Sequence, residues 1–355
     1  MLSRPRMPMT QTTTPAPPPG GSPPVERRRR IWPRVLIGIA CLLVAALGAA
    51  AVLYAVNIDR TLTSNLNRGV DLPSEAPSRA GPGESPRPTK EPQEQGTLNY
   101  VLLGSDSRDP ENVGQGRSDT IMVVHLNAKR NQAYIISFPR DMYVTIPGHG
   151  RNKINAAYAF GGAPLTVRTL ENLTGTRMDH VALVDFEGFI SLTNDLSGVT
   201  VMNKNAFSSH GFDYPVGKIT MQGERALWFV RERKALPRGD LDRAENQRNV
   251  IKAVVGKGLS ARVMSDPATF TKFIGNVAKH LTVDRSLTDD EIRRTALSLR
   301  LNVDEVEGLQ APISGFGTSS EGQSIDIVDT AKMAELGKAL KTDSMADYVK
   351  KYPQG

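Results

Sequence analysis

Cysteine is almost absent from this 355-residue chain, since Cys41 is its only copy. A single cysteine excludes an intrachain disulfide and a zinc site built from thiolates. Because Cys41 lies inside an apolar run, it is also a poor candidate for a nucleophile. Histidine is scarce too, and the five copies have no spacing typical of a metal site. The sequence therefore gives no sign of thiol chemistry or of a histidine-bound metal.

Positive charge is also scarce once the first residues are set aside. The formal net charge is +7. Seven arginines stand against Glu26 before Val35, so about +6 of that charge lies in the first tenth of the chain. The remainder is nearly neutral, which argues against a nucleic-acid interface on the main domain. We expect no nucleic-acid partner.

Three segments precede the expected folded domain. Residues 1–30 are rich in proline, threonine and glycine and end in four arginines, a composition typical of a disordered tail. Residues 35–57 carry no charge and would span about 33 Å as a helix, which matches a bilayer core. Residues 58–97 contain many prolines and read as an extended linker.

The uncharged run at 35–57 predicts a retained membrane anchor, because it is too long for the core of a signal peptide. A buried helix of a soluble domain is the alternative. Arginines flank the run on its N-terminal side, so the positive-inside rule places the tail in the cytoplasm. Everything beyond the anchor would then lie outside the cell membrane, in a single-pass arrangement.

Residues 98–352 are expected to form the folded domain. Apolar runs at 99–104, 119–126 and 132–138 predict strands, and the short connection between the last two predicts a hairpin. More strands are expected at 180–184, 199–202 and 324–328, and helices at 164–173, 186–196, 241–255, 267–280, 288–299 and 330–340. A further helix should follow Gly223. This alternation of strands and helices indicates an α/β layered domain.

The stretch 231–247 is the most informative part of the chain. It contains Arg231, Arg233, Arg238, Asp240, Asp242 and Arg243, and ends at Gln247. Guanidinium groups at this density suit an anion with several oxygens, such as a pyrophosphate, because each group donates paired hydrogen bonds. Arg243 and Gln247, four residues apart in an expected helix, would share one face. A solvated charged surface is the alternative.

Charged pairs also stand at one end of each of the first three predicted strands. They are Asp106 and Arg108, Arg117 and Asp119, and Arg140 and Asp141. One such pair is common and means little. Three pairs flanking the strands of one sheet indicate a shared site, because functional residues concentrate in loops on a rigid scaffold.

Taken together, these residues resemble the LytR-CpsA-Psr family of membrane-anchored enzymes of bacterial cell-wall assembly. The resemblance covers roughly residues 98–340. Its motifs follow one another in the family's order at 104–108, 117–120, 137–141, 152–158, 231–233, 239–243 and Gln247. The sequence departs from the pattern at Asn246, where a basic residue would be expected.

The resemblance implies an α/β/α sandwich with a central mixed sheet that encloses an apolar pocket for a polyprenyl lipid. It also implies a phosphotransferase that moves a glycopolymer from a polyprenyl-pyrophosphate carrier to peptidoglycan through a phosphodiester bond, with Mg²⁺ as cofactor. Polyprenyl phosphate would be released. The sequence does not single out the polymer, because teichoic acid, arabinogalactan and capsular polysaccharide use similar carriers.

The family's functional residues can be carried over by motif position. The resemblance assigns Mg²⁺ to Asp106 and Asp119, and the phosphates to Arg117, Arg140, Arg231, Arg233, Arg243 and Gln247. Asp240 would order the arginines or act in proton transfer, which makes Arg140, Arg231, Arg233, Asp240 and Arg243 the expected catalytic set. Two Asp carboxylates together with substrate phosphates fit the oxygen-only coordination that Mg²⁺ prefers.

Two other functions stay open at this point. A pyrophosphatase would use water in place of the glycan acceptor. A non-catalytic, membrane-anchored protein that binds wall polymers or regulates gene expression would need no Mg²⁺ and neither aspartate.

Overall fold

The computed structural model describes residues 64–75, 86–90, 92–105 and 118–353. They all belong to one compact unit that runs from Leu53 to Gly355. The tail predicted at 1–30 and the membrane helix predicted at 35–57 lie outside the described residues. Among the described residues, none of the helices is both long enough and apolar enough to cross a bilayer.

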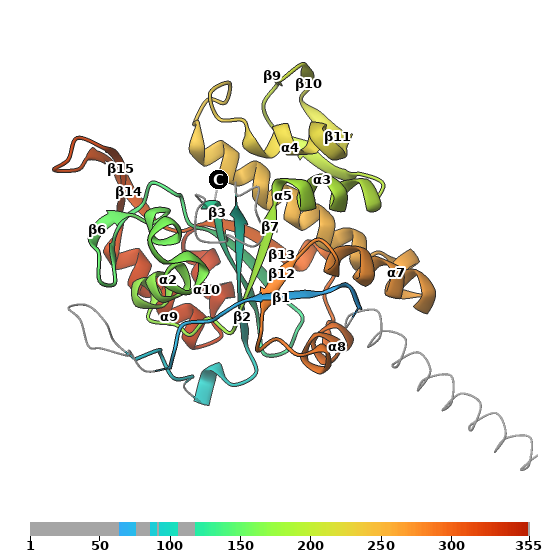
Figure 1. Ribbon diagram of the computed structural model, residues 1–355, viewed down its shortest axis with the longest axis horizontal. Helices are drawn as coiled ribbons and strands as arrows, with labels where there is room; N and C mark the ends of the chain where they lie inside the picture. The colour runs from blue at the N-terminus through green and yellow to red at the C-terminus, as the bar shows by residue number, and fades with distance from the viewer. Residues whose placement is uncertain (1–63, 76–85, 91, 106–117, 354–355) are drawn as a thin grey trace, which may run out of the picture. The chain divides into compact units, whose positions relative to one another are not determined.

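A seven-stranded mixed sheet forms the centre of the domain (Figure 1). Its strands, in spatial order, are β1 (Asn67–Val70), β12 (Thr282–Asp284), β7 (His180–Asp185), β2 (Leu98–Ser105), β3 (Ser118–Leu126), β4 (Ala133–Ser137) and β13 (Val306–Gln310). Strand β3 is antiparallel to both β2 and β4, which confirms the predicted hairpin. Strand β7 runs parallel to β2, and β13 runs parallel to β4. Four strands of the sheet therefore point their C-terminal ends at the same edge.

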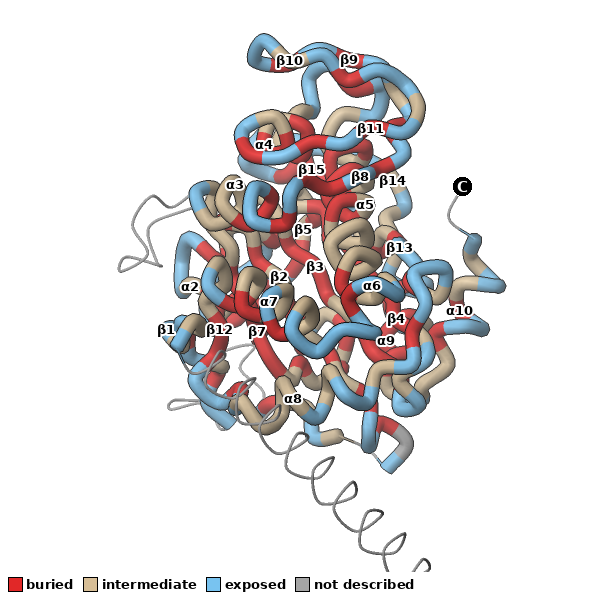
Figure 2. Tube along the Cα trace, turned by 90° about the vertical axis from the view of Figure 1, so that its right-hand side faces the viewer, coloured by how far each residue is buried: buried red, intermediate tan, exposed pale blue. Residues whose placement is uncertain are grey.

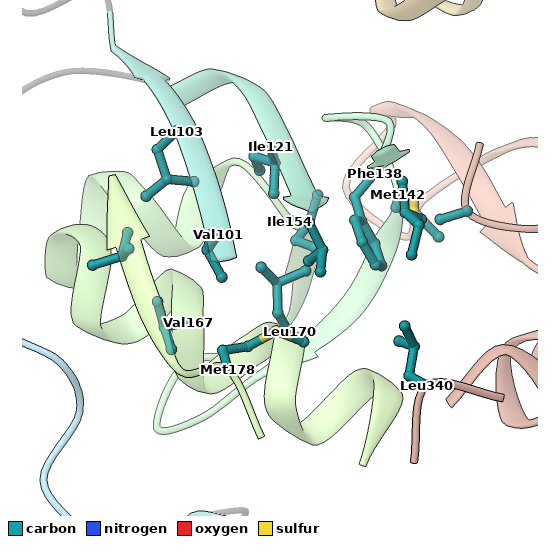
Figure 3. Packing of buried hydrophobic residues seen from close by; sticks show 14 of the residues in the cluster. Val101, Leu103, Ile121, Phe138, Met142, Ile154, Val167, Leu170, Met178 and Leu340 are labelled. Carbon is teal, nitrogen blue, oxygen red and sulfur yellow. The ribbon is translucent and has the colours of Figure 1, made fainter. Parts of the chain in front are cut away.

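The first face of the sheet is covered by α2 (Ala156–Thr174), α9 (Thr330–Lys341) and α10 (Met345–Lys351). Alternate residues of β2, Val101 and Leu103, point into this core because side chains alternate across a strand. Figure 3 shows them among Val167, Leu170 and Leu340 from the covering helices. Helix α2 is kinked at residues 161–162, so the predicted helix 164–173 corresponds to its second half.

The opposite face is covered mainly by α5 (Asp240–Gly258). Met122 and Ile135 of the sheet pack there against Ile251 and Val255. The short helix α6 (Ala261–Met264) and helices α7 (Pro267–Ala278) and α8 (Asp289–Ser298) complete this side, where Leu287 and Ala182 are buried. Two helical layers thus enclose one mixed sheet, as the resemblance implied, and the burial along the strands is visible in Figure 2.

A small lobe stands over the edge where the parallel strands end (Figure 1). It combines α3 (Phe186–Asp195) and α4 (Gly223–Arg231) with the strand pairs β8–β11 (Val199–Asn203, Gly217–Met221) and β9–β10 (Phe207–Ser209, Phe212–Tyr214). Its own core includes Phe207, Tyr214 and Phe229, whose ring centroids lie 4.6 to 5.7 Å apart. This packing fixes the position of α4, whose last residue is Arg231.

Two more hairpins lie beside α2 and β4. They are β5–β6 (Tyr143–Ile146, Gly150–Lys153) and β14–β15 (Ile313–Thr318, Ser324–Val328). Asp326 donates its backbone N–H to the carbonyl of Asp141 at 2.9 Å, so the second hairpin is attached directly behind the end of β4. Single 3-10 turns at Pro92–Glu94 and Val303–Glu305 complete the described elements.

The linker predicted for residues 58–97 needs correction where the structure describes it. Asn67–Val70 forms the edge strand β1, parallel to β12. Farther along, Arg87 is only 5% exposed and donates through Nη2 to Glu171 at 2.7 Å and to the carbonyl of Met178 at 2.6 Å. The proline-rich composition did not predict this ordered structure, because the contacts that hold β1 and Arg87 come from β12 and α2, which are distant in the sequence.

Candidate functional site

The edge where the parallel strands end carries the first two site residues. Asp119 is the second residue of β3, and Arg140 follows the end of β4 by three residues. Between the neighbouring strands, Gly104 of β2 faces Thr120 of β3. A Cβ atom at position 104 would lie 2.9 Å from the Cβ of Thr120, so the absence of a side chain at Gly104 lets the strands approach there.

A chain of ion pairs joins this edge to α5. Arg140 Nη1 lies 2.6 Å from Asp119 Oδ1, and its Nε lies 3.3 Å from Asp240 Oδ1. Arg243 Nη2 lies 2.5 Å from the same oxygen of Asp240. Asp240 and Arg243 occupy the first turn of α5. Side chains more than 120 positions apart therefore meet at one place, as the sequence predicted for them.

A pocket of about 260 Å³ opens beside these ion pairs. Its polar lining consists of Asp119, Thr120, Arg140, Asp185, Arg231, Arg233, Arg243 and Gln247. The rest of its wall is apolar and comes mainly from α3, α4 and α5, with Val184, Phe186, Phe189, Leu227, Val230, Val250 and Ile251. The pocket thus combines an arginine-rich part with a greasy part, which suits a ligand with an anionic head and a hydrocarbon tail.

Two arginines of the pocket face it without an acidic partner. Among the described residues, no carboxylate forms an ion pair with Arg231 or Arg233. The guanidinium carbon of Arg231 lies 4.2 Å from the ring centroid of Phe186 and 4.8 Å from that of Trp228. Stacking on these rings holds the guanidinium by its faces and leaves its N–H edge free to donate to an anion.

Burial shifts the acid–base properties of the ion-pair chain. Burial raises the pKa of Asp240 above its usual value, although Arg243 and Arg140 act in the opposite direction. Burial also lowers the pKa of Arg243. For Arg140 burial acts downward as well, but the hydrogen bond to Asp119 and the charge of Asp240 outweigh it and raise the pKa. Arg140 therefore stays charged even though it is largely enclosed.

The arginine-rich stretch divides into two groups with different roles. Arg238 turns away from the pocket, with Nε 2.7 Å from Asp242 Oδ1 and Nη2 2.5 Å from Glu245 Oε2. Gln247 lines the pocket, and its Nε2 donates to the carbonyl of Val230 at 3.1 Å, which ties α5 to the end of α4. Arg238 and Asp242 thus stabilise the start of α5 and are not part of the pocket.

Three positions from the family motifs need separate mention. Asp106 and Arg117 lie outside the described residues. Asn246, where the sequence departs from the motif, is buried, and its Nδ2 has no hydrogen-bond partner among the described residues. Every other predicted site residue lines the pocket or pairs with a residue that does.

The donor set of the pocket is compatible with a hard divalent cation. Asp119 lines the pocket and accepts from Arg140 through Oδ1, while its Oδ2 accepts no hydrogen bond from a described residue. Mg²⁺ takes one or two protein carboxylates together with substrate phosphates and waters. Within the described residues, no group of three histidine, cysteine, aspartate or glutamate side chains could hold a metal ion by itself.

The resemblance implied an apolar pocket, but the sequence did not identify the residues that line it or the polar residue Asp185. Asp185 ends β7 and caps α3, accepting from the backbone N–H of Gly188 at 2.7 Å. Because β7 is parallel to β2, its end lies at the same edge as the motif residues. If the predicted strand at 180–184 had been placed parallel to β2, the residue after it, Asp185, would have been expected at this edge. No sequence signal distinguishes Phe186 or Val250 from ordinary core residues.

An α/β/α sandwich with four arginines gathered at the mouth of an apolar pocket defines a protein that binds an anionic amphiphile. Residues 70–342 match the model of the LytR_cpsA_psr family. The match covers well over half of the chain, and the chain belongs to this family.

Curated relatives include the polyisoprenyl-teichoic acid–peptidoglycan teichoic acid transferase TagU of Enterococcus faecalis. It is 33% identical over 290 residues, which are 81% of this chain and 92% of the relative. The TagU protein of Bacillus subtilis is also 33% identical, over 69% of this chain and 77% of the relative. The named activity of these relatives is transfer of teichoic acid to peptidoglycan.

Solved structures agree with the fold. TagT bound to LIIa-WTA has a TM-score of 0.57 and 28% identity, and the alignment covers 78% of this chain and all of that chain. B. subtilis TagV has a TM-score of 0.61 and 25% identity, with 70% of this chain and 97% of that chain covered. The mixed central sheet and its two helical layers are therefore the fold of known family members.

Proposed function

We propose that this protein transfers a glycopolymer from a polyprenyl-pyrophosphate carrier to peptidoglycan. The observation that carries the proposal is the pocket itself, in which Arg140, Arg231 and Arg243 stand at the mouth of an apolar cavity. A pyrophosphate fits the arginines, and the first part of a hydrocarbon chain fits the lining from α3, α4 and α5. The activities named for the TagU relatives support the same reaction.

In the proposed reaction, a hydroxyl oxygen of the acceptor glycan forms a bond to the phosphorus that carries the donor sugar. The bond from that phosphorus to the lipid phosphate breaks, and the lipid phosphate leaves with the electron pair. Such a transfer needs in-line positioning and neutralisation of spreading negative charge, and little covalent help. Arg231 and Arg233 line the pocket and form no ion pair with a carboxylate of the described residues, so they supply positive charge there.

Asp240 has a positioning part in this scheme. It lies between Arg140 and Arg243 and pairs with both through one oxygen. Two arginines that share a carboxylate are held at a fixed separation before the substrate arrives, so little reorganisation is needed during the reaction. Its part is therefore to order the two arginines, since Asp240 itself is not among the residues that line the pocket.

Mg²⁺ is part of the proposal. Asp119 and Asp106 are the residues that would hold it, by the position of Asp119 in the pocket and by the family motif for Asp106. When bound, the ion would neutralise charge on the pyrophosphate oxygens. Asp119 also orients Arg140 through its 2.6 Å contact, so it serves the pocket in two ways.

The proposed location follows from the anchor predicted at residues 35–57. The N-terminal tail would lie in the cytoplasm, and the domain would act on lipid carriers at the outer surface of the cell membrane. Fusion of a reporter enzyme to either end of the chain, with activity measured on each side of the membrane, tests this orientation. A C-terminal reporter active in the cytoplasm would contradict it.

The reaction is tested with the full-length protein in detergent, a polyprenyl-pyrophosphate-linked glycopolymer, peptidoglycan and Mg²⁺. We expect polymer linked to peptidoglycan and an equal amount of lipid phosphate, both abolished by a chelator and restored by added Mg²⁺. Release of lipid phosphate at the same rate with and without peptidoglycan would identify a pyrophosphatase. Binding of polymer that survives the chelator and the Asp119→Asn variant, without any release, would identify a binding protein.

A further inference from the structure

A second pocket adjoins the first at Arg140. Its volume is about 310 Å³, and it is lined by Arg140, Asp141, Asn152, Lys153, Asn155, Ala156, Ala159 and Gln323. Arg140 also lines the apolar pocket, so its side chain stands between the two. A volume near 300 Å³ is at the lower end of the range for small-molecule sites and gives room for about one sugar ring.

The second pocket contains the one sequence motif, residues 152–158, that the arginine-rich pocket does not use. Asn152 and Lys153 end β6, and Asn155 immediately precedes α2. Gln323 comes from the turn before β15, and contacts of α2 with β6 and of β15 with β5 bring these elements together (Figure 1). Two segments about 170 positions apart in the chain thus contribute polar side chains to one cavity.

The charges in the second pocket are compensated. Lys153 Nζ lies 2.9 Å from Asp141 Oδ1, and Asp141 Oδ2 lies 3.6 Å from Arg140 Nε. In the first pocket, by contrast, Arg231 and Arg233 have no acidic partner among the described residues. An anionic head group is therefore favoured in the first pocket, and a neutral polar group in the second.

The second pocket also offers both kinds of hydrogen-bonding group. Asn152 accepts from the backbone N–H of Lys153 at 2.8 Å through Oδ1, which leaves the N–H groups of its amide as donors. Gln323 donates from Nε2 to Glu321 at 3.1 Å, which leaves its amide oxygen as an acceptor. The side chain of Asn155 makes no capping hydrogen bond to α2. Primary amides of this kind match the hydroxyl and acetamido groups of an amino sugar.

In-line attack decides which sugar enters this pocket. The attacking oxygen must approach the phosphorus from the side opposite the leaving lipid phosphate. Since the lipid phosphate stays with its chain in the apolar pocket, the acceptor has to come from outside that pocket. The second pocket adjoins it at Arg140, the residue that lines both.

We propose that the pocket formed by Asn152, Asn155 and Gln323 is the acceptor subsite and binds an N-acetylated amino sugar of a glycan strand. The inference rests on the proposed transferase function and deepens it. When the acceptor oxygen bonds to phosphorus, its proton passes to Asp141, the carboxylate that lines this pocket. Arg140 then contacts donor phosphate on one side and acceptor sugar on the other.

The test compares acceptor and donor kinetics in the full-length protein. Soluble, uncrosslinked peptidoglycan glycan strands serve as the acceptor. For the Asn152→Ala/Asn155→Ala double variant and for Gln323→Ala, we expect the KM for glycan strands to rise about tenfold, because two or three hydrogen bonds are lost. The KM for the lipid-linked donor and kcat at saturating acceptor should stay within about twofold.

The matched control is Gln222→Ala. Gln222 is an exposed amide at the N-cap of α4. Like Asn155 at the N-cap of α2, its side chain makes no capping hydrogen bond, but Gln222 lines neither pocket. It should leave both KM values unchanged. A rise in the donor KM of the pocket variants instead of the acceptor KM would assign the pocket to the donor sugar and overturn the proposal, as would unchanged kinetics.

Direct binding separates this inference from the proposed function. Calorimetric titration of glycan strands into the full-length protein, without donor, should show binding that both pocket variants weaken about tenfold and Gln222→Ala does not. Equal binding by wild type and pocket variants would overturn the inference, even if transfer occurs. If the wild type transfers no polymer but its binding of glycan strands is still weakened by the pocket variants, the transferase function is contradicted and the glycan subsite is retained.

Discussion

Two arginine–carboxylate clusters in this protein are built for different purposes. In the first cluster, Arg87 donates to both carboxylate oxygens of Glu171 on α2, at 2.7 to 3.2 Å, and to the carbonyl of Met178. Glu171 is completely buried and also accepts from the backbone N–H of Met178 at 3.1 Å. At the first pocket, four arginines stand beside three aspartates (Asp119, Asp185 and Asp240), and Nε of Arg140 and Nε of Arg243 have no hydrogen-bond partner among the described residues.

The difference lies in what each cluster leaves unsatisfied. Arg87 and Glu171 compensate each other's charge and use their hydrogen-bonding groups within the domain, so this cluster only stabilises the fold. The pocket cluster keeps positive charge and free donors, which an incoming anion can use. A buried ion pair is thus a sign of function only when its charges do not balance.

The largest expected effect is that of Arg140→Ala. Removing this side chain deletes the link between Asp119 and Asp240 and one cation at the reacting phosphates. We expect transfer to fall by a factor of about 10³ or more, measured as kcat/KM with the full-length protein. Arg238→Ala, from the same arginine-rich segment but outside the pocket, should keep activity within about threefold; similar losses for both variants would abolish the distinction between the clusters.

Next in size is Arg87→Ala, which should act on stability alone. Glu171 would be left as a buried charge without its partner, at a cost of about 3–5 kcal/mol in the free energy of unfolding. Activity per folded molecule should be unchanged. Chemical denaturation measures the loss, with Arg285→Ala as control, because Arg285 and Asp71 form an ion pair in which both side chains are more than 60% exposed. The control should cost less than about 1 kcal/mol.

A smaller effect is expected at Asp326, which lies behind the pocket. Burial, together with the charges of Asp141 and Asp240, raises its pKa from 3.8 to about 6. The folded protein therefore binds this proton more tightly than the unfolded chain, so the contribution of Asp326 to stability falls as the pH rises from about 4 to 6. Asp326→Asn should be about 2–3 kcal/mol more stable than wild type at pH 7 and nearly equal below pH 4.

Chemical denaturation of wild type and Asp326→Asn at pH 4 and pH 7 measures the difference in their free energies of unfolding. The other titrating groups are the same in both proteins, so their contributions cancel in this difference. An equal difference at pH 4 and pH 7 would contradict the raised pKa. Such a result would also argue against the burial of Asp326 beside Asp141 and Asp240, which is what raises its pKa.

The smallest expected effect is that of Arg231→Lys, which keeps the charge and removes the planar fork. The ammonium group cannot stack on Phe186 and Trp228 and still present paired donors to a phosphate. We expect kcat/KM to fall about 10-fold to 100-fold. Lys234→Ala, an exposed neighbour that does not line the pocket, should have no effect. An unchanged rate for Arg231→Lys would show that the pocket requires only net charge.

Much of the fold and the polar half of the site could be predicted because the signals are local. The apolar runs of β2, β3 and β4 are contiguous, and the motif aspartates and arginines stand directly at their ends. The helix predicted at 241–255 corresponds to α5, and Arg243 and Gln247, four residues apart in it, both line the first pocket. Local patterns of this kind carry their own structural meaning.

The rest depends on contacts between distant residues. Strand β1 is four residues long and pairs with β12, more than 200 positions away, and its Arg68 is bonded to the equally distant Leu287 and Asp289. The apolar wall of the first pocket uses residues such as Phe189 and Val250, whose side chains would look the same in any core. The polar set around Asn152 and Gln323 is brought together by the packing of β6 against α2 and of β15 against β5.

Strands β13 and β15 are both attached near the end of β4. Strand β13 pairs with the whole of β4, and Asp326 of β15 is hydrogen-bonded to Asp141, the residue next to Arg140. The motif residues all precede position 248, yet the segment that supports Arg140 is completed only by residues 306–328. We therefore expect a chain that stops before residue 306 to encode the expected catalytic set and yet be inactive, and the domain to become competent during synthesis only after residues 306–328 have emerged.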